Sequence, residues 1–201
     1  NTNKWMKVDI KSVSPAARSG HAMASLGNSG DVLLFGGSDD QDFDDTWIFN
    51  SITNEWMKNI NSAKSPSARD SHGMAPLGID GNVLLFGGYT GDDAYSSETW
   101  LYEKKKGQWT KESTSSSPSA RSYPAMGSLG VDGKIVLFGG VDINIHYLVD
   151  TWIYDQKKKN WVHDNAKATI FSPKSRSRHA MASLGGTNVL LFGSAGADGI
   201  F

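Results

Sequence analysis

Four arginines occupy the same place in four repeated segments, each three residues after a proline, and their side chains are well suited to binding acids. A guanidinium group can hold a carboxylate or a phosphate through two parallel hydrogen bonds. If the four side chains converge, they predict a binding site on the protein surface. The alternative is that each arginine pairs with an acidic residue of its own repeat: Asp45, Glu98 or Asp150. The arginines are Arg18, Arg69, Arg121 and Arg176.

A second kind of chemistry lies in three acidic segments that follow in the same repeats. They comprise residues 38–45, 89–98 and 141–150, with ten Asp or Glu and no Lys or Arg. These segments predict a negative surface for a basic partner, with Asp42 in the densest of them. The Asp40-x-Asp42-x-Asp44 spacing resembles the start of a calcium loop, but Asp45 and Ser51 stand where glycine and glutamate are required. Solvated loops with turn-forming aspartates are the other interpretation.

Several aromatic residues depart from the repeat near the same segments and are further candidates for partner contact. Residues 143–148 are apolar and aromatic where the corresponding segments are polar, so they predict either an exposed partner contact or local packing. The candidates are Tyr89, Tyr95, Tyr123, His146 and Tyr147.

Composition excludes several classes of site. The chain has no cysteine, which removes disulfides, thiolate metal sites and cysteine nucleophiles. Three recurring histidines, His21, His72 and His179, could in principle share a metal, but we expect structural roles for them and no cofactor or metal. A net charge of −1 argues against binding to nucleic acid or to an anionic membrane. No apolar run is long enough for a membrane helix, and no sequence feature indicates a compartment.

The elements that must position these residues follow from an internal repeat of about 50 residues. An apolar run that ends in two glycines, first seen at Val32–Gly37, returns three times; in the last copy Ser194 replaces the second glycine. A Thr-Trp pair follows three of the runs, and a second tryptophan lies nine residues further on. These second tryptophans are Trp56, Trp109 and Trp161. We expect the tryptophans to fill the space between stacked sheets.

Each repeat predicts four strands. Residues 18–26 alternate, with Ala22, Ala24 and Leu26 on one face, which indicates a half-buried strand. Residues 32–35 are apolar on both faces, which indicates a strand buried on both sides. Residues 46–49 predict a third strand and the segment around Trp56 a fourth, separated by polar turns.

The double glycines, the two spaced tryptophans and the period resemble the kelch repeat family over nearly the whole chain. The resemblance implies an all-β fold, a β-propeller of four-stranded antiparallel kelch blades. It also implies that the loops leading into the first and third strands form a face that commonly binds peptides. The four arginines would lie near the mouth of the central channel on that face. We therefore expect a non-catalytic recognition or scaffold module that binds a protein or peptide there.

A carbohydrate-binding or sugar-processing propeller is the alternative function. Galactose oxidase carries a similar propeller, but its copper site needs a cysteine-linked tyrosine, which this chain cannot form. Sialic-acid mutarotases are also kelch propellers and use arginines and acids at the channel mouth, so Arg121 with Glu98 or Asp150 could do acid–base work. A shallow floor of tyrosines would favour a glycan, and a broad charged rim would favour a protein.

We expect residues 1–201 to form one propeller domain or part of one. The repeats span about 15–56, 66–109 and 118–161, with a last blade at 173–201 that residues 1–8 could complete. This amounts to four blades, whereas the resemblance implies rings of six or seven. A closed four-bladed ring, two chains that complete a larger ring, and a fragment of a longer protein remain open.

Overall fold

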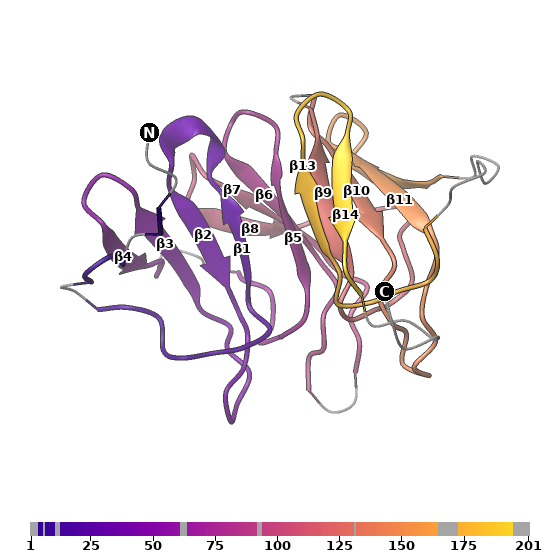
Figure 1. Ribbon diagram of the computed structural model, residues 1–201, viewed down its shortest axis with the longest axis horizontal. Helices are drawn as coiled ribbons and strands as arrows, with labels where there is room; N and C mark the ends of the chain where they lie inside the picture. Colours follow the sequence, from indigo (N-terminus) through magenta and orange to yellow (C-terminus); the bar gives the residue numbers. More distant parts are fainter. Residues whose placement is uncertain are drawn as a thin grey trace.

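The computed structural model shows an all-β molecule built of sheets that stand side by side (Figure 1). In the described part of the chain there are three four-stranded sheets and one two-stranded sheet, all antiparallel. The only helix there is a three-residue turn, η1 (Gly27–Ser29), so none could cross a bilayer. The structure describes residues 4–5, 7–10, 13–60, 64–91, 94–130, 132–164 and 173–194.

The first sheet, blade 1, has its strands in the order of the sequence. These are β1 (Ala22–Ser25), β2 (Val32–Phe35), β3 (Thr46–Asn50) and β4 (Glu55–Lys58). The last three agree with the predicted strands. The first is shorter than predicted, because Gly20 has a φ of +63° and the ladder begins only at Ala22. In the segment 18–26, Ala24 and Leu26 are buried while Met23 is exposed, as the alternation predicts.

The next two sheets repeat this arrangement, and a two-stranded sheet follows them. Blade 2 contains β5 (Gly73–Leu77), β6 (Asn82–Phe86), β7 (Thr99–Glu103) and β8 (Gln108–Lys111). Blade 3 contains β9 (Ala125–Leu129), β10 (Lys134–Phe138), β11 (Thr151–Asp155) and β12 (Asn160–His163). Blade 4 consists of β13 (Ala180–Ser183) and β14 (Val189–Phe192). The innermost strands β1, β5, β9 and β13 are neighbours in that order, as in a β-propeller (Figure 1).

The predicted completion of the last blade falls largely outside the described residues. Residues 1–3 and 195–201 are among those the structure leaves out. Trp5, assigned to an outer strand in that prediction, is fully exposed, and the described residues before Ala22 form no strand. The closure of blade 4 by the two termini therefore stays a prediction.

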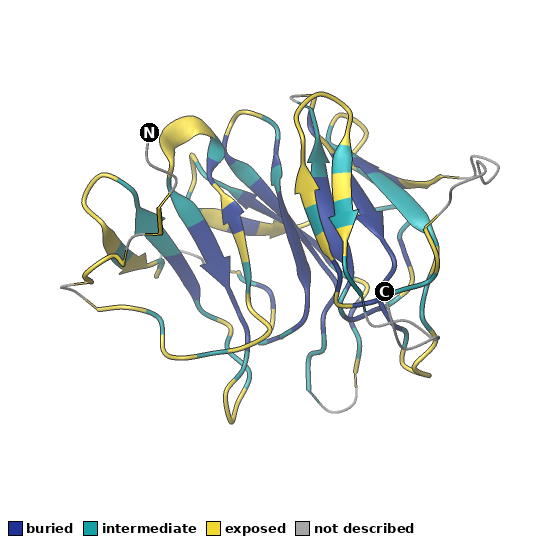
Figure 2. Cartoon of the chain, viewed as in Figure 1, coloured by how far each residue is buried: buried dark blue, intermediate teal, exposed yellow. Residues whose placement is uncertain are grey.

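Two apolar cores lie between the blades, one on each side of blade 2 (Figure 2). Leu33 and Phe35 of blade 1 pack against blade 2, whose opposite face packs against blade 3. The second tryptophan of a blade joins it to the blade before: Trp109 Nε1 donates to Thr46 Oγ1 at 2.9 Å. Trp161 repeats the contact on Thr99, also at 2.9 Å, so these tryptophans fill the space between sheets as predicted.

Candidate functional site

The loops that lead into the first and third strands have the same backbone pairing in each of the first three blades. The segment after each arginine bridges to the loop before the third strand, and that loop folds back on itself. The bridges are Ser19–Ser38–Asp42, Asp70–Tyr89–Tyr95 and Ser122–Val141–Tyr147. Asp42, Tyr95 and Tyr147 are therefore equivalent positions on three neighbouring blades, which the sequence alone did not show.

Each of the first three arginines is paired within its own blade, as the second interpretation of the sequence predicts. Arg121 donates to both carboxylate oxygens of Asp150, at 2.6 and 2.7 Å, and to the carbonyl of Gly139 at 3.0 Å. Arg18 makes the same fork with Asp45, and Arg69 binds Glu98 at 2.7 Å. The side chains of Arg69 and Arg121 are completely buried. These guanidinium groups therefore hold the loops that carry the site.

The acidic partners stay ionised because of this pairing. Burial opposes ionisation of Glu98, but hydrogen bonds from Lys111, Trp100 and Arg69 outweigh it and lower its pKa to about 2. The pKa of Asp150 is also lowered, since its bonds to Arg121 exceed the cost of burial. The fourth arginine, Arg176, is half-buried and donates to the Gly193 carbonyl at 3.2 Å.

Two residues after each arginine, the backbone enters the left-handed region in all four blades. The φ values are +63° at Gly20, +54° at Ser71, +54° at Tyr123 and +56° at Arg178. The amide of Ser71 donates to the Gly20 carbonyl at 2.7 Å, and the amide of Tyr123 donates to the Ser71 carbonyl at 2.7 Å. Main-chain hydrogen bonds thus link these positions from blade 1 to blade 2 and from blade 2 to blade 3.

A hollow of about 200 Å³ opens at this place, with walls from all four blades. On one side the Arg178 guanidinium stacks over the Tyr123 ring at 4.4 Å. Arg178 was not among the sequence candidates, although it departs from the repeat at the same position as Tyr123. The hollow is lined by Gly20, His21, Ser71, His72, Tyr123, Pro124, Arg178 and His179.

Two carboxylates from different blades approach each other beside this hollow. The pKa of Asp42 is raised, first by burial and then by the negative charge of Asp70. The Ser71 hydroxyl donates to Asp70. Neither aspartate belongs to an ion pair within the described residues. Asp70 was missed in the sequence because only the fold brings it to Asp42.

Two tyrosines belong to the same group of loop residues as this acidic pair. The rings of Tyr89 and Tyr95 meet edge to face, with centroids 6.0 Å apart and an interplanar angle of 84°. Burial, followed by the proximity of Tyr123, Tyr89 and Asp70, raises the pKa of Tyr95. We define the loop-face cluster as Asp42, Asp70, Tyr89, Tyr95, Tyr123 and Arg178.

The apolar loop of blade 3 is organised separately. His146 Nδ1 lies 3.0 Å from Asp142 Oδ2, and its backbone amide donates to Asp142 Oδ1 at 2.8 Å. Ile143 and Ile145 are exposed, while Tyr147 is half-buried. The exposed isoleucines agree with the first interpretation of this loop, an exposed segment; a partner contact by His146 and Tyr147 stays a prediction.

Two of the three recurring histidines, His72 and His179, pack between blades, whereas His21 is exposed. His72 meets the Phe35 ring edge-on at 5.6 Å, and His179 meets Phe138 at 5.7 Å. Neither ring nitrogen of either histidine has a hydrogen-bond partner. Burial, with the positive charge of Arg69 and Arg176 respectively, lowers their pKa values to about 3 and about 4. Among the residues described, no three His, Cys, Asp or Glu side chains converge on a metal position.

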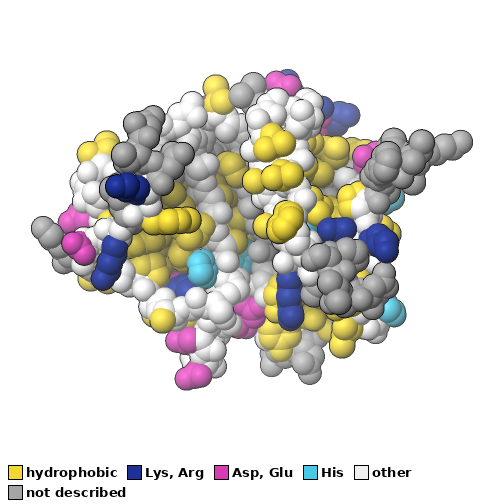
Figure 3. Space-filling model, viewed as in Figure 1, with side chains coloured by type: hydrophobic (Ala, Val, Ile, Leu, Met, Phe, Trp, Pro, Cys, Tyr) yellow, Lys and Arg dark blue, Asp and Glu magenta, His cyan; other side chains and the backbone are white. Residues whose placement is uncertain are grey.

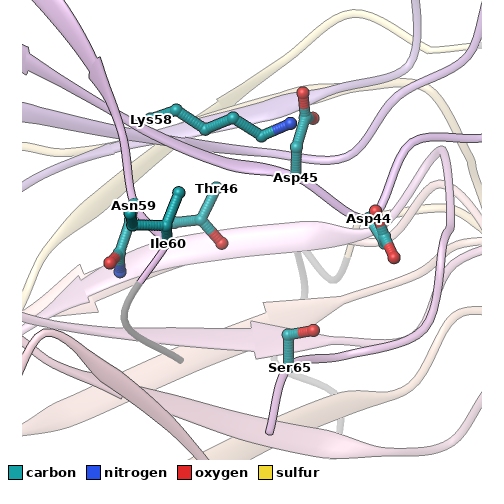
Figure 4. A pocket seen from close by; sticks show the side chains of 7 residues that line it. All are labelled: Asp44, Asp45, Thr46, Lys58, Asn59, Ile60 and Ser65. Atoms are coloured by element: carbon teal, nitrogen blue, oxygen red, sulfur yellow. The ribbon is translucent and has the colours of Figure 1, made fainter. Parts of the chain in front are cut away.

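A second hollow of about 330 Å³ lies at the outer side of blade 1 (Figure 4). Two of its polar groups already have partners: Thr46 accepts the Trp109 indole, and Asn59 donates to the Gly107 carbonyl at 2.9 Å. Figure 4 shows the Lys58 ammonium group directed toward Asp45, whose pKa it helps to lower. We therefore regard the loop-face cluster as the stronger candidate site.

Comparison with known proteins gives a consistent result. A family model described as the KLHDC2/KLHL20/DRC7 Kelch-repeats domain matches residues 1–194. Kelch domain-containing protein 2 of Bos taurus is 30% identical over 142 residues, covering 70% of this chain and 34% of that protein. F-box/kelch-repeat protein At1g51550 of Arabidopsis thaliana is 26% identical over 208 residues, covering 94% and 42%. The tRNA wybutosine-synthesizing protein 4 of Emericella nidulans is 31% identical over 146 residues, covering 69% and 13%. The chain thus spans less than half the length of these relatives.

Proposed function

The chain belongs to the kelch-repeat family, whose members commonly mediate protein–protein interaction, and we propose that its loop face binds a basic segment of a protein or peptide. The observation that carries the proposal is the pair of carboxylates, Asp42 and Asp70, beside a hollow walled by four blades. Rigid blades that carry variable loops are a common way to build a recognition surface.

The chemistry of the cluster favours a lysine or arginine side chain. An ammonium or guanidinium group placed between Asp42 and Asp70 would relieve the repulsion that raises the pKa of Asp42. The neighbouring faces of Tyr89 and Tyr95 would add cation–π attraction. Asp39, Asp40 and Asp44, in the loop that carries Asp42, add negative charge beside the cluster, whereas Asp45, Glu98 and Asp150 are neutralised by their arginines.

The cluster supports a protein ligand better than a glycan. Tyr89 and Tyr95 meet edge to face, so they do not form a flat platform for a sugar ring. Tyr147 belongs to the blade 3 loop rather than to the cluster. The acid–base candidates Arg121 and Asp150 are locked in a buried ion pair, which supports a non-catalytic role.

The test is calorimetric titration of the chain with three capped tripeptides made of lysine, glutamate or serine. We expect only the lysine peptide to bind, and the double variant Asp42→Asn, Asp70→Asn to weaken it at least about tenfold. Asp40→Asn, at an exposed position of the same loop, is the matched control and should bind normally. Affinity should also fall as the pH drops through the raised pKa of Asp42, because a cation binds the ionised form. Equal binding by the double variant, or binding of the glutamate peptide alone, would contradict the proposal.

A further inference from the structure

One member of the loop-face cluster, Arg178, carries a charge opposite to that of the acidic pair. Asp42 and Asp70 come from blades 1 and 2, whereas Arg178 comes from blade 4 and lies over the Tyr123 ring of blade 3. Figure 3 shows acidic side chains along the lower edge of the molecule, beneath blade 1, and a basic side chain beneath β13 and β14. The loop face therefore presents separate negative and positive regions.

Shared neighbours place both charges at the hollow of about 200 Å³. Ser71 lines the hollow and its hydroxyl donates to Asp70, while a Cβ on Gly20, another lining residue, would be 3.1 Å from the Asp70 Cβ. Arg178 lines the hollow directly. The pKa of Tyr95, raised first by burial, is raised further by Asp70 and lowered by Arg178. The two charges are thus close enough to act on one side chain.

The Arg178 guanidinium keeps hydrogen-bonding capacity for a ligand. Its Cζ lies 4.4 Å from the centroid of the Tyr123 ring, and a guanidinium placed over a ring keeps its N–H donors at the edge. Unlike Arg69 and Arg121, Arg178 is exposed, and it belongs to no ion pair among the residues that the structure describes. A carboxylate can accept two parallel hydrogen bonds from such an edge.

Arg178 is also the one cation among the described residues that line the hollow. Burial lowers the pKa values of His21, His72 and His179, so these three lining side chains are neutral at pH 7. A ligand with basic side chains alone would leave Arg178 facing a charge of its own sign. An acidic group beside the basic one would remove this repulsion and pair with the guanidinium.

We propose that Arg178 binds the carboxylate of an acidic side chain, so that the loop face selects a segment in which an acidic residue lies close in sequence to the basic one. The inference rests on the proposed function, in which Asp42 and Asp70 hold the basic side chain. Because the ligand there is a segment within a chain, its carboxylate comes from aspartate or glutamate. The acidic loops repel an isolated anion, so the carboxylate adds affinity only to a segment that the basic residue has already placed.

The test is calorimetric titration at low salt with two capped pentapeptides. Both have lysine at the centre with serine on either side, and both ends are glutamate in one peptide and glutamine in the other. We expect wild type to bind the glutamate-ended peptide at least about fivefold more tightly. Arg178→Met keeps the packing on Tyr123 and should abolish the difference, and Arg178→Glu should make the glutamine-ended peptide the tighter ligand.

Lys105→Met is the matched control for net charge. The Lys105 side chain is 85% exposed on the turn between β7 and β8, at the end of β7 away from the loop face, so this variant should keep the full difference. A difference that survives Arg178→Met would overturn the assignment of the carboxylate to Arg178.

The outcomes also separate this inference from the proposed function. Equal binding of the two peptides by wild type, still weakened by Asp42→Asn with Asp70→Asn, would overturn the Arg178 subsite and leave the proposed function intact. Binding of neither peptide would overturn both. A gain from a free C-terminal carboxylate on the glutamine-ended peptide, with none from the glutamate side chains, would overturn the selection of an acidic side chain.

Discussion

At the scale of single residues, the same side chain has different roles in different blades. Arg69 and Arg121 are buried and bound to carboxylates of their own blade, so they fix loops. Arg178 is exposed and stacks over Tyr123, and no ion pair among the described residues includes it. Charge counts cannot separate these roles, because they depend on whether a carboxylate lies within reach.

The buried pairs should be costly to break from the acidic side. Asp150→Ala leaves the buried Arg121 guanidinium without its carboxylate, and we expect a loss of about 3 kcal/mol of unfolding free energy. Urea unfolding at neutral pH measures it. Asp80→Ala removes an exposed partner of Lys105 and should change stability little. Equal effects would show that burial of Arg121 does not set the cost.

His72 should make the chain sensitive to mild acid. Its pKa is about 3 in the folded chain and near 6.5 in the unfolded chain, so only the unfolded chain takes up a proton between these values. The stabilisation that comes from the neutral His72 ring is complete above pH 6.5. The free energy of unfolding falls as the pH drops, and at pH 5 it is lower by about 2 kcal/mol. Urea unfolding of His72→Leu at pH 7 and pH 5 should show a smaller difference than wild type.

At the scale of elements, the double glycines join the strands of one blade to the loops of the next. Gly36, Gly87 and Gly139 have φ values between +64° and +74°, and each lies against an arginine carbonyl of the following blade. A side chain there would force adjacent blades apart. Gly193 has a similar φ of +78° but no such neighbour.

This difference predicts that replacing glycine by alanine lowers the stability of the protein more at Gly139 than at the equivalent Gly193. Gly139→Ala should cost roughly 3 kcal/mol or more, since backbone strain adds to a clash with the Arg176 carbonyl. Gly193→Ala should cost only about 1 to 2 kcal/mol for the left-handed backbone. Thermal or urea unfolding compares the free energies of unfolding of the two variants. Similar losses at both sites would contradict the role assigned to the arginine carbonyl.

The sequence predicted the strands of each blade better than it predicted the contacts between blades. The β2 strand begins and ends where its apolar run does, and the pairing of arginines with third-strand acids follows from their recurrence. The repeat gives each residue a position within its blade, but it does not give the distance between blades. For that reason the approach of Asp42 to Asp70 became visible only in the structure.

At the scale of the whole molecule, the chain is an array in which each blade depends on its neighbours. Blade 2 is covered on both faces, and several of its core residues are 0% exposed. Blade 4 is covered on one face, and β14 exposes Leu190 and Phe192. In such arrays stability is close to a sum over units and their interfaces, so it should decline toward the ends.

Hydrogen exchange should follow this gradient. The amides of β13 and β14 should exchange fastest and those of β5 and β6 slowest, because local opening needs little apolar surface to be exposed at the end of the array. Mass spectrometry of peptides from each strand measures the rates. Uniform exchange across the blades would mean that the array unfolds as one unit.

At the position two residues after each arginine, the groups that hold the backbone in place differ from the side chains displayed at the surface. Four blades place glycine, serine, tyrosine and arginine on the same left-handed backbone, and the links at Ser71 and Tyr123 use only main-chain atoms. The side chain displayed there takes no part in these links, so the constraint on its identity comes from the left-handed backbone, which disfavours β-branched residues. In evolution, one substitution per blade at these positions could change the ligand without changing the main-chain links between the blades.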